Sequence, residues 1–254
     1  MTLIQVINPN TARAMTEAIG HAARAVAGPG TTITAVSPDM GPESIESHYD
    51  AALAVPGVLG LVAAGERAGA DGYVIACFGD PGLDAARELA AGPVAGIAEA
   101  AMHAASFLGR TFSVVTTLSR TAGRTWDLVR RYGFGDACRN VHACDLPVLA
   151  LDSAEARAVI AKRCALARDA DGCDVIVLGC AGMTGLAAEL TGDLGIPVVD
   201  GVAAATKTVE ALVALGLRTS PRDEFAPPPA KPYSGLLSGF GLRADAPGPR
   251  LDQA

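Results

Sequence analysis

One segment of the chain is repeated, and this repeat restricts the possible folds more than any other feature. The first copy is Tyr73-Val-Ile-Ala-Cys-Phe-Gly-Asp-Pro-Gly-Leu83, and the second is Ile176-Val-Leu-Gly-Cys-Ala-Gly-Met-Thr-Gly-Leu186. Both contain a short apolar run, a cysteine, two glycines at the same spacing and a leucine where a helix is expected. Further Pro-Val pairs follow at Pro93 and Pro197. Such a repeat predicts two similar lobes related by a pseudo-twofold axis.

Short apolar runs alternate with longer helical segments along most of the chain. The apolar runs are too short for helices and are expected to be strands at 3–7, 31–36, 73–77, 93–95, 112–116, 174–178 and 197–199. Helices are expected between them, at 12–26, 51–69, 83–90, 97–108, 120–132, 154–169, 182–190 and 202–215. This alternation predicts an α/β fold with parallel sheets and right-handed crossovers.

The repeat also suggests where the lobes begin and end. Residues 1–96 are expected to form the first lobe, completed by the helix at about 203–220. Residues 97–202 are expected to form the second lobe. Residues 221–254 contain seven of the 16 prolines and little periodicity, which predicts an extended or disordered tail.

Charge and hydrophobicity exclude several classes of partner. The 254 residues carry 20 Lys and Arg against 27 Asp and Glu, a net charge of -7 without a basic block. We therefore expect no binding to nucleic acid or anionic membranes. No uninterrupted run of about 20 apolar residues is present to span a membrane. The N-terminal residues lack the basic and apolar regions of a secretory signal, so a cytoplasmic location is expected.

Two of the six cysteines occupy equivalent places in the repeat. Cys77 and Cys180 each end an expected strand and precede a glycine-containing turn. Ligands of parallel α/β sheets bind beyond the carboxyl ends of the strands. A pseudo-twofold axis would therefore make the two thiols face each other across a cleft. Two opposed acid/base groups on either side of one carbon are what a cofactor-independent racemase or epimerase requires.

The other cysteines are expected to be packing residues, because a free cysteine behaves as a small hydrophobic residue. They lack symmetric mates and zinc-ligand spacing, and they are Cys138, Cys144, Cys164 and Cys173. No CxxC pair, GxGxxG fingerprint or P-loop is present. We therefore expect free thiols, no metal and no cofactor.

Proton removal beside a carbonyl produces an enolate, whose oxygen needs preorganised hydrogen-bond donors. The candidates are the backbone amides of the turns 78–80 and 181–183, with the side chains of Asn10, Thr116 and Thr117. The thiolate also needs help, because a free cysteine has a pKa near 8.5. A helix N-terminus contributes about 0.3–1 kcal/mol, which is less than one pKa unit. Nearby N–H donors or a polar substrate must supply the remainder.

Several separated motifs together resemble the hydantoin racemase family, within the aspartate/glutamate racemase superfamily. They are found in this order at 6–11, 41–46, 73–83, 97–101, 177–183 and 197–201. The resemblance implies a cofactor-independent enzyme with two flavodoxin-like lobes and a cleft between them. It also implies that Cys77 and Cys180 are catalytic. The implied reaction is racemisation of D- and L-5-monosubstituted hydantoins at C5, which lies next to the C4 carbonyl.

The same resemblance implies a set of substrate-binding residues. The positions that correspond to the family's motifs are Asn8, Asn10, Ile45, Phe78, Gly79, Asp80, Thr116, Thr117, Ala181, Gly182 and Met183. Amino-acid racemases of the superfamily usually have Asn-Thr or Asn-Ser after the cysteine. Here Phe-Gly and Ala-Gly follow the cysteines. A neutral ring is therefore expected as substrate rather than free aspartate or glutamate.

Alternatives remain open at the level of the sequence. Allantoin, itself a 5-ureidohydantoin, is the alternative substrate, because allantoin racemases share these motifs. Arylmalonate decarboxylases keep only the second-lobe cysteine, so Cys77 argues against that reaction. A non-catalytic two-lobe binding protein would not need paired thiols. A thiol redox protein would need Cα atoms within about 7 Å, and we expect the two cysteines to be farther apart. A homo-oligomer of unspecified size is expected.

Overall fold

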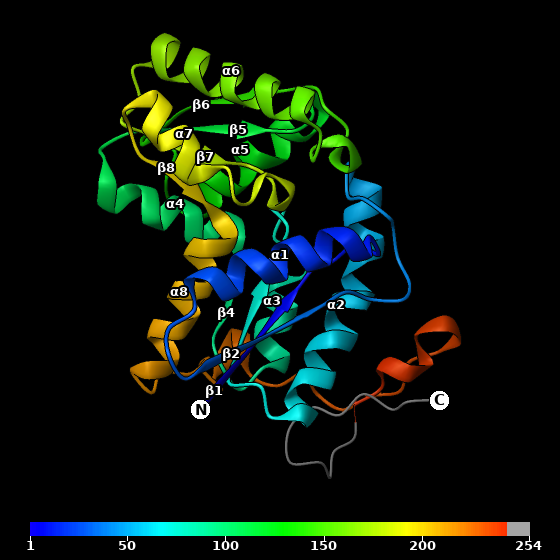
Figure 1. Cartoon of the computed structure of the whole chain (residues 1–254). Coiled ribbons are helices and arrows are strands. Elements are labelled where there is room, and N and C mark those ends of the chain that lie inside the picture. Colours follow the sequence, from blue (N-terminus) through cyan, green and yellow to red (C-terminus); the bar gives the residue numbers. More distant parts are fainter. Residues whose placement is uncertain (243–254) are drawn as a thin grey trace.

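The computed structural model describes residues 1–242 and contains two parallel four-stranded sheets (Figure 1). The first sheet has the order β2-β1-β3-β4, formed by β1 (Thr2–Ile7), β2 (Thr31–Val36), β3 (Gly72–Ile75) and β4 (Val94–Gly96). The second has the order β6-β5-β7-β8, formed by β5 (Phe112–Thr116), β6 (Cys138–Ala143), β7 (Val175–Leu178) and β8 (Val198–Asp200). The two sheets have equivalent strand orders, which confirms the predicted α/β fold with two similar parallel lobes.

The helices cover both faces of each sheet, as parallel sheets require. They are α1 (Arg13–Val26), α2 (His48–Ala68), α3 (Leu83–Leu89), α4 (Ile97–Leu108), α5 (Ala122–Arg131), α6 (Ala154–Asp171), α7 (Ala187–Leu194) and α8 (Gly201–Ala214). The two lobes exchange one helix each. Helix α4 follows the first sheet but packs on β7 of the second, while α8 follows the second sheet and packs on β1 and β3 (Figure 1).

This exchange joins the lobes through a shared core. Val6 and Val74 of the first sheet belong to the same buried cluster as Val114 and Val177 of the second. Helices α4 and α8 lie between them and contact each other. A Cβ atom at Gly201, the first residue of α8, would lie 2.7 Å from the Ile97 carbonyl oxygen. Only glycine permits this approach, which fixes the two helix starts next to each other.

Two sequence-based expectations about elements were wrong. Strand β6 was not expected, because Cys138-Arg-Asn-Val-His-Ala143 is an edge strand in which polar and apolar residues are mixed, without the apolar run of a buried strand. The helix after Cys180 was expected at 182–190. Instead a 3-10 turn covers Ala181–Met183, and Gly185 follows with a φ of 83°. Helix α7 therefore begins only at Ala187.

Helix α2 is the one helix among residues 1–242 that is long and apolar enough to cross a membrane. Core helices of folded domains pass the same test of length and composition. In α2, Val58 and Val62 are fully buried and belong to one cluster with Ile7 and Ile75 of the first sheet. One face of this helix therefore packs on the first lobe.

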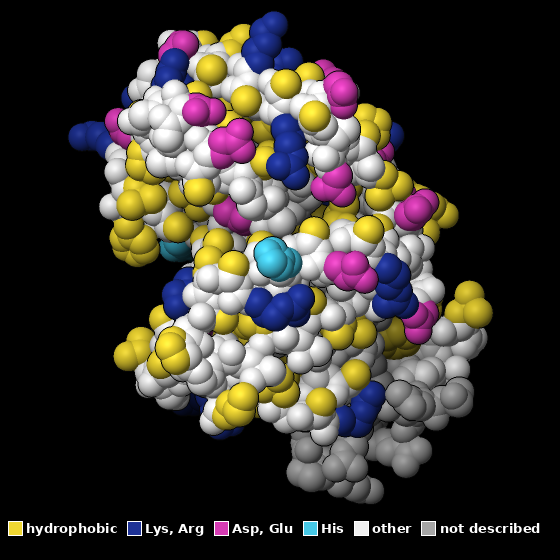
Figure 2. Space-filling view, viewed as in Figure 1, with side chains coloured by type: hydrophobic (Ala, Val, Ile, Leu, Met, Phe, Trp, Pro, Cys, Tyr) yellow, Lys and Arg dark blue, Asp and Glu magenta, His cyan; other side chains and the backbone are white. Residues whose placement is uncertain are grey.

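The described part of the predicted tail lies against the outer side of the first lobe. Residues 221–242 are mostly extended, with 3-10 turns at Asp223–Phe225 and Gly235–Phe240. Arg87 of α3 lies 5.8 Å from the centroid of the Phe225 ring. The predicted tail at 243–254 falls outside the described residues. On the face seen in Figure 2, basic and acidic side chains are interspersed, without a large patch of one sign.

Candidate active site

A pocket opens between the lobes, where the carboxyl ends of β1 and β3 meet those of β5 and β7. It contains about 580 Å³ of empty space, including space open to solvent. Its lining consists of Asn10, Met15, Ile45, Ala76, Cys77, Phe78, Gly79, Thr116, Thr117, Thr121, Arg124, Thr125, Val148, Gly179, Cys180 and Ala181.

Cys77 and Cys180 both line this pocket, and both are partly buried free thiols. Each comes shortly after the central strand β3 or β7, so the repeat brings them to equivalent strand ends. The glycine two residues later has a specific role in each copy. The Gly182 amide donates to Cys180 Sγ at 3.4 Å, and the Gly79 amide makes a hydrogen bond that lowers the pKa of Cys77. These amides therefore stabilise negative charge on sulfur.

The surroundings of the two thiols differ electrostatically. Burial is the main cause that raises the pKa of both, and it raises that of Cys180 to about 12. Cys77 and Glu46 raise the pKa of Cys180 further. The positive charge of Arg124 lowers the pKa of Cys77 instead. The pocket is therefore not electrostatically symmetric, although its backbone is built from a repeat.

Asn8 and Asn10 follow β1 and play different parts. Asn8 is 1% exposed and does not line the pocket; its Nδ2 donates to Asn10 Oδ1 at 2.8 Å and to Thr16 Oγ1 at 3.0 Å. Asn10 lines the pocket, and its Nδ2 donates to Met15 Sδ at 3.3 Å. Thioethers are weak acceptors, so this amide can exchange partners. Asn8 thus orients Asn10, whose amide can reach a ligand.

The loop before α2 closes one side of the pocket. Ile45 lines it, and the neighbouring Glu46 accepts a hydrogen bond from the Val148 amide of the second lobe at 2.9 Å. Ile45 of the first lobe and Val148 of the second therefore lie next to each other and form an apolar wall of the pocket. His48, also in this region, is exposed and is not among the lining residues.

Thr116 and Thr117 follow β5 on the opposite side. Both side chains are nearly buried and line the pocket. Thr116 Oγ1 donates to the Gly179 carbonyl at 3.2 Å, which joins the ends of β5 and β7 directly before Cys180. Thr117 is thus the one of the pair whose hydroxyl has no protein partner among the described hydrogen bonds of residues 1–242.

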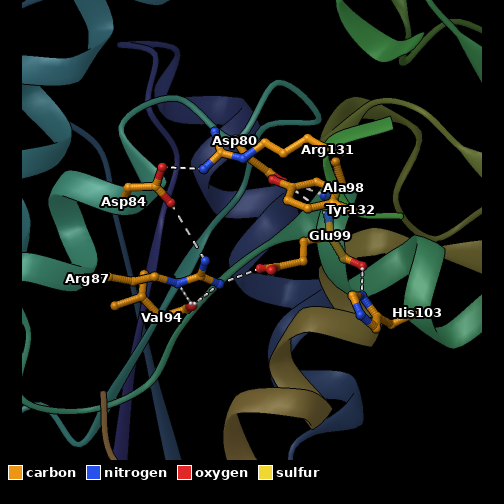
Figure 3. Close-up of polar contacts among 9 residues, drawn as sticks. All are labelled: Asp80, Asp84, Arg87, Val94, Ala98, Glu99, His103, Arg131 and Tyr132. Atoms are coloured by element: carbon orange, nitrogen blue, oxygen red, sulfur yellow. Dashed lines mark hydrogen bonds and ion pairs between the residues drawn. The ribbon is translucent and has the colours of Figure 1, made fainter. Parts of the chain in front are cut away.

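The Asp80 side chain points toward Tyr132 and the start of α4 (Figure 3), and Asp80 is not among the pocket-lining residues. Its Oδ1 accepts from the Ala98 amide at 3.1 Å, and its Oδ2 accepts from the Glu99 amide at 3.1 Å. Tyr132 of the second lobe also donates its hydroxyl to Asp80 Oδ2 at 2.7 Å. Asp80 therefore caps α4 and ties the Cys77 turn to α5. Burial raises the pKa of its carboxyl to about 6, although these donors oppose the shift.

In the second lobe, the equivalent helix α8 is capped by a carboxylate at a different position. Asp200 ends β8 and accepts from the Val202 amide at 2.8 Å, which caps α8. It also accepts from Thr184 Oγ1 at 2.6 Å and so holds the segment after Cys180. In the first lobe the place equivalent to Asp200 is Gly96. A Cβ atom there would lie 2.2 Å from the Asp80 carboxyl carbon, so the glycine makes room for it.

Further ion pairs join the helices around Asp80 (Figure 3). Arg131 of α5 pairs with Asp84 at the start of α3. Arg87 of α3 pairs with Glu99 of α4 and donates to the Val94 carbonyl at 3.1 Å. Together with Tyr132 and Asp80, these contacts connect α3, α4 and α5 around the turn.

Most of the residues implied by the family motifs lie on the pocket surface. They are Asn10, Ile45, Cys77, Phe78, Gly79, Thr116, Thr117, Cys180 and Ala181. Four do not line it: Asn8 and Asp80 position their neighbours, Gly182 directs its amide at Cys180, and Met183 is fully buried in the second-lobe core. Direct contact of these four residues with substrate stays a prediction.

The comparison with known families matches this arrangement. The model of the Asp/Glu/hydantoin racemase family matches residues 4–209 of the chain. The chain belongs to this family. It is 45% identical to a hydantoin racemase of Pseudomonas sp. (strain NS671), over 94% of this chain and 96% of that one. It is 46% identical to a hydantoin racemase of Rhizobium meliloti, over 91% and 97% of the two chains. The protein is thus an isomerase of the racemase type.

Solved structures give the same result for the fold. An allantoin racemase from Klebsiella pneumoniae superposes with a TM-score of 0.92 and 56% identity, over 94% of this racemase and 98% of that chain. An arylmalonate decarboxylase structure superposes with a TM-score of 0.59 over 86% and 96% of the chains. At 20% identity, the second similarity concerns the fold alone.

The sequence did not identify several pocket residues of this racemase. Met15 lies in the first turn of α1, and Thr121, Arg124 and Thr125 lie at the start of α5. Helices α1 and α5 follow β1 and β5, whose ends were already expected at the site. These residues could therefore have been found from the repeat by including the first helical turn after each of these strands.

The four cysteines outside the pocket are buried in the second lobe. Cys144, Cys164 and Cys173 belong to its outer core, and Cys138 belongs to the shared core. Within residues 1–242, no cluster of three or more His, Cys, Asp or Glu side chains is arranged to hold a metal ion.

Proposed function

We propose that this racemase inverts C5 of 5-monosubstituted hydantoins without a cofactor, using Cys77 and Cys180 as the two acid/base groups. One observation carries the proposal: the two thiols line a single pocket from equivalent strand ends, each with a glycine amide hydrogen-bonded to its sulfur. A pocket with one thiol could remove a proton but could not return it to the opposite face.

The proposed reaction moves one proton at each face of the ring. A thiolate takes the C5 proton and becomes a thiol, and the C5–H electron pair moves into an enolate with the C4 carbonyl. The thiol on the other face then donates its proton to C5 and becomes a thiolate. Positioned acid/base groups typically contribute about 10²–10⁴-fold to such a step. The pocket must also hold the enolate oxygen, for which donors contribute further.

Two side chains are suited to bind the ring. Asn10 Nδ2 donates to the weak acceptor Met15 Sδ, and Thr117 also lines the pocket. We propose that they donate to ring oxygens, while the Gly79 and Gly182 amides serve the sulfurs. This differs from a role for both glycine amides in binding the enolate.

Allantoin is the second candidate substrate, and one observation favours it. The allantoin racemase from Klebsiella pneumoniae is 56% identical to this chain, whereas the hydantoin racemases are 45–46% identical. The polar lining by Thr121, Arg124 and Thr125 could bind a ureido group. The apolar wall of Ile45 and Val148 suits an aromatic substituent instead.

The test is the loss of optical rotation from L-5-benzylhydantoin and from (S)-allantoin in parallel assays. Faster racemisation of one identifies the preferred substituent. Inactivity on both would refute the assignment of a hydantoin ring. The folded state of the sample is checked by circular dichroism before either assay.

The two-base mechanism predicts the effect of single cysteine variants. Cys77→Ser and Cys180→Ser should each lower racemisation at least about 10²-fold, because serine is a much weaker acid than cysteine. Cys173→Ala changes a buried cysteine outside the pocket and is the matched control. Full racemisation by either serine variant would contradict the mechanism, and binding without turnover by the wild type would favour a non-catalytic binding protein.

We further propose that the protein is a cytoplasmic homo-oligomer whose partners are small molecules rather than nucleic acid or membranes. The net charge of -7 without a basic block supports the last point. Size-exclusion chromatography with light scattering measures the oligomeric state directly.

A further inference from the structure

Arg124 reaches from the second lobe onto the turn that carries Cys77. Its Nη2 donates to the Gly79 carbonyl oxygen at 2.7 Å. Gly79 makes this approach possible, since a Cβ atom there would lie 2.4 Å from Nη2 and 2.5 Å from Cζ. The guanidinium thus occupies the space of a missing side chain two residues after Cys77. This geometry fixes a positive charge on the turn that carries Cys77, and this charge lowers the pKa of the Cys77 thiol.

The charge of Arg124 is not neutralised by a neighbouring carboxylate. Within residues 1–242 no Asp or Glu side chain forms an ion pair with it, whereas Arg130 and Arg131 of the same helix both do. Arg124 is also the only charged side chain among the residues that line the pocket. The electric field of this positive charge therefore acts on the groups that line the pocket.

The charged and titratable groups around each thiol differ in sign. Cys77 has Arg124 on one side and Asp80 in its own turn, but the Asp80 carboxyl is directed toward α4 and Tyr132. Cys180 has Cys77, Glu46 and Cys144 around it, and none of these is a cation. Burial raises the pKa of both thiols, but only Cys77 has a neighbouring cation that opposes this shift.

We propose that Arg124 makes Cys77 the first of the two thiols to ionise in the free enzyme, while Cys180, beside Glu46, stays the thiol. This inference rests on the proposed two-base function and names the base of the resting state. Arg124 acts through Cys77 and is therefore a positioning residue. After Cys77 removes a proton and Cys180 donates one, the enzyme holds a Cys77 thiol and a Cys180 thiolate. Return of one proton from Cys77 to Cys180 through solvent restores the starting form.

The thiolate can be measured without a substrate, by the pH dependence of alkylation with iodoacetamide. The thiolate is the nucleophile, so the rate at each cysteine reports its ionised fraction. Peptide mass spectrometry follows Cys77 and Cys180 separately in the same sample. In the wild type, Cys77 should react with the lower apparent pKa of the two.

Three arginine variants separate charge from structure. In Arg124→Gln the apparent pKa of Cys77 should rise by about one unit, because the variant removes the positive charge that lowers it, and a nearby opposite charge typically lowers a pKa by about 1–3 units. Alkylation of Cys77 well below its pKa should then slow about tenfold, while Cys180 changes less than about twofold. Arg124→Lys keeps the charge and should recover most of the rate. Arg130→Gln, on the exposed face of α5, should leave both rates unchanged.

A second variant, Glu46→Gln, tests Cys180 and provides an independent result if Arg124→Gln does not fold. Glu46→Gln should speed alkylation of Cys180 without slowing that of Cys77. Equal changes at both cysteines in Arg124→Gln, no change at either, or faster reaction of Cys180 than Cys77 in the wild type would each overturn the proposal. Because no substrate is used, these outcomes are independent of the racemisation assays, which test the proposed function separately.

Discussion

Replacement of Asp80 by asparagine should change how the stability of the protein depends on pH. The Asp80 side chain is 7% exposed and accepts from the Ala98 amide, the Glu99 amide and the Tyr132 hydroxyl. Burial is the largest influence and raises the pKa of the carboxyl from 3.8 to about 6. At 1.36 kcal/mol per unit, this shift corresponds to about 3 kcal/mol.

The direction of the effect follows from proton binding. The folded state holds the Asp80 proton more tightly than the unfolded state, so this group stabilises the fold fully below pH 3.8. That contribution is lost as the pH rises through about 6. Between pH 5 and pH 7 the linkage relation gives a loss of about 1.3 kcal/mol in the free energy of unfolding. The asparagine variant has no titrating group at this position and should lack this component.

Urea unfolding of both proteins at pH 5, 6 and 7 measures the difference, with the protein concentration held constant. The single tryptophan, Trp126, lies in α5 near this network and provides the fluorescence signal. The free energy of unfolding of the wild type minus that of Asp80→Asn should fall by about 1.3 kcal/mol from pH 5 to pH 7. Asp127→Asn, on the exposed side of α5, controls for the loss of one negative charge. A difference that stays constant or rises over this range would refute the reasoning.

The remaining predictions concern the two helix caps behind the cysteines. Gly96→Ala should destabilise the protein by about 1–3 kcal/mol, because the new Cβ would collide with the Asp80 carboxyl carbon. Gly123→Ala, where no atom lies within 4 Å of the new Cβ, is the matched control and should be neutral or stabilising in thermal unfolding. Asp200→Ala should lose about 1–2 kcal/mol through the N-cap of α8. Unchanged unfolding of this variant would contradict the capping role of the carboxylate.

The arrangement of the two carboxylates explains why a repeat can give unequal sites. Each lobe needs one carboxylate to cap the helix after its fourth strand, namely α4 or α8. The first lobe places it in the cysteine turn as Asp80, and the second places it at the end of β8 as Asp200. The first solution requires glycine at position 96. The same backbone plan therefore surrounds the two thiols with different polar groups.

The sequence by itself determined the two lobes, the parallel strands and the positions of both cysteines at strand ends. These features follow from local patterns: short apolar runs form buried strands, and glycine-containing turns end them. Strand β6 was not predicted, because an edge strand with polar residues such as Arg139, Asn140 and His142 has no apolar run. Its place was nevertheless implied by the equivalent strand β2 of the first lobe.

Only the tertiary structure decided which groups surround the thiols. Arg124 and Gly79 are far apart in sequence and meet because α5 of the second lobe packs against the Cys77 turn of the first. Asp80 belongs to a motif that suggested contact with substrate, and only the structure shows that its carboxyl caps α4. Short-range patterns fix strands and turns because those depend on neighbouring residues. The field at each of the two pocket thiols depends on which distant charges the packing of the lobes brings to it.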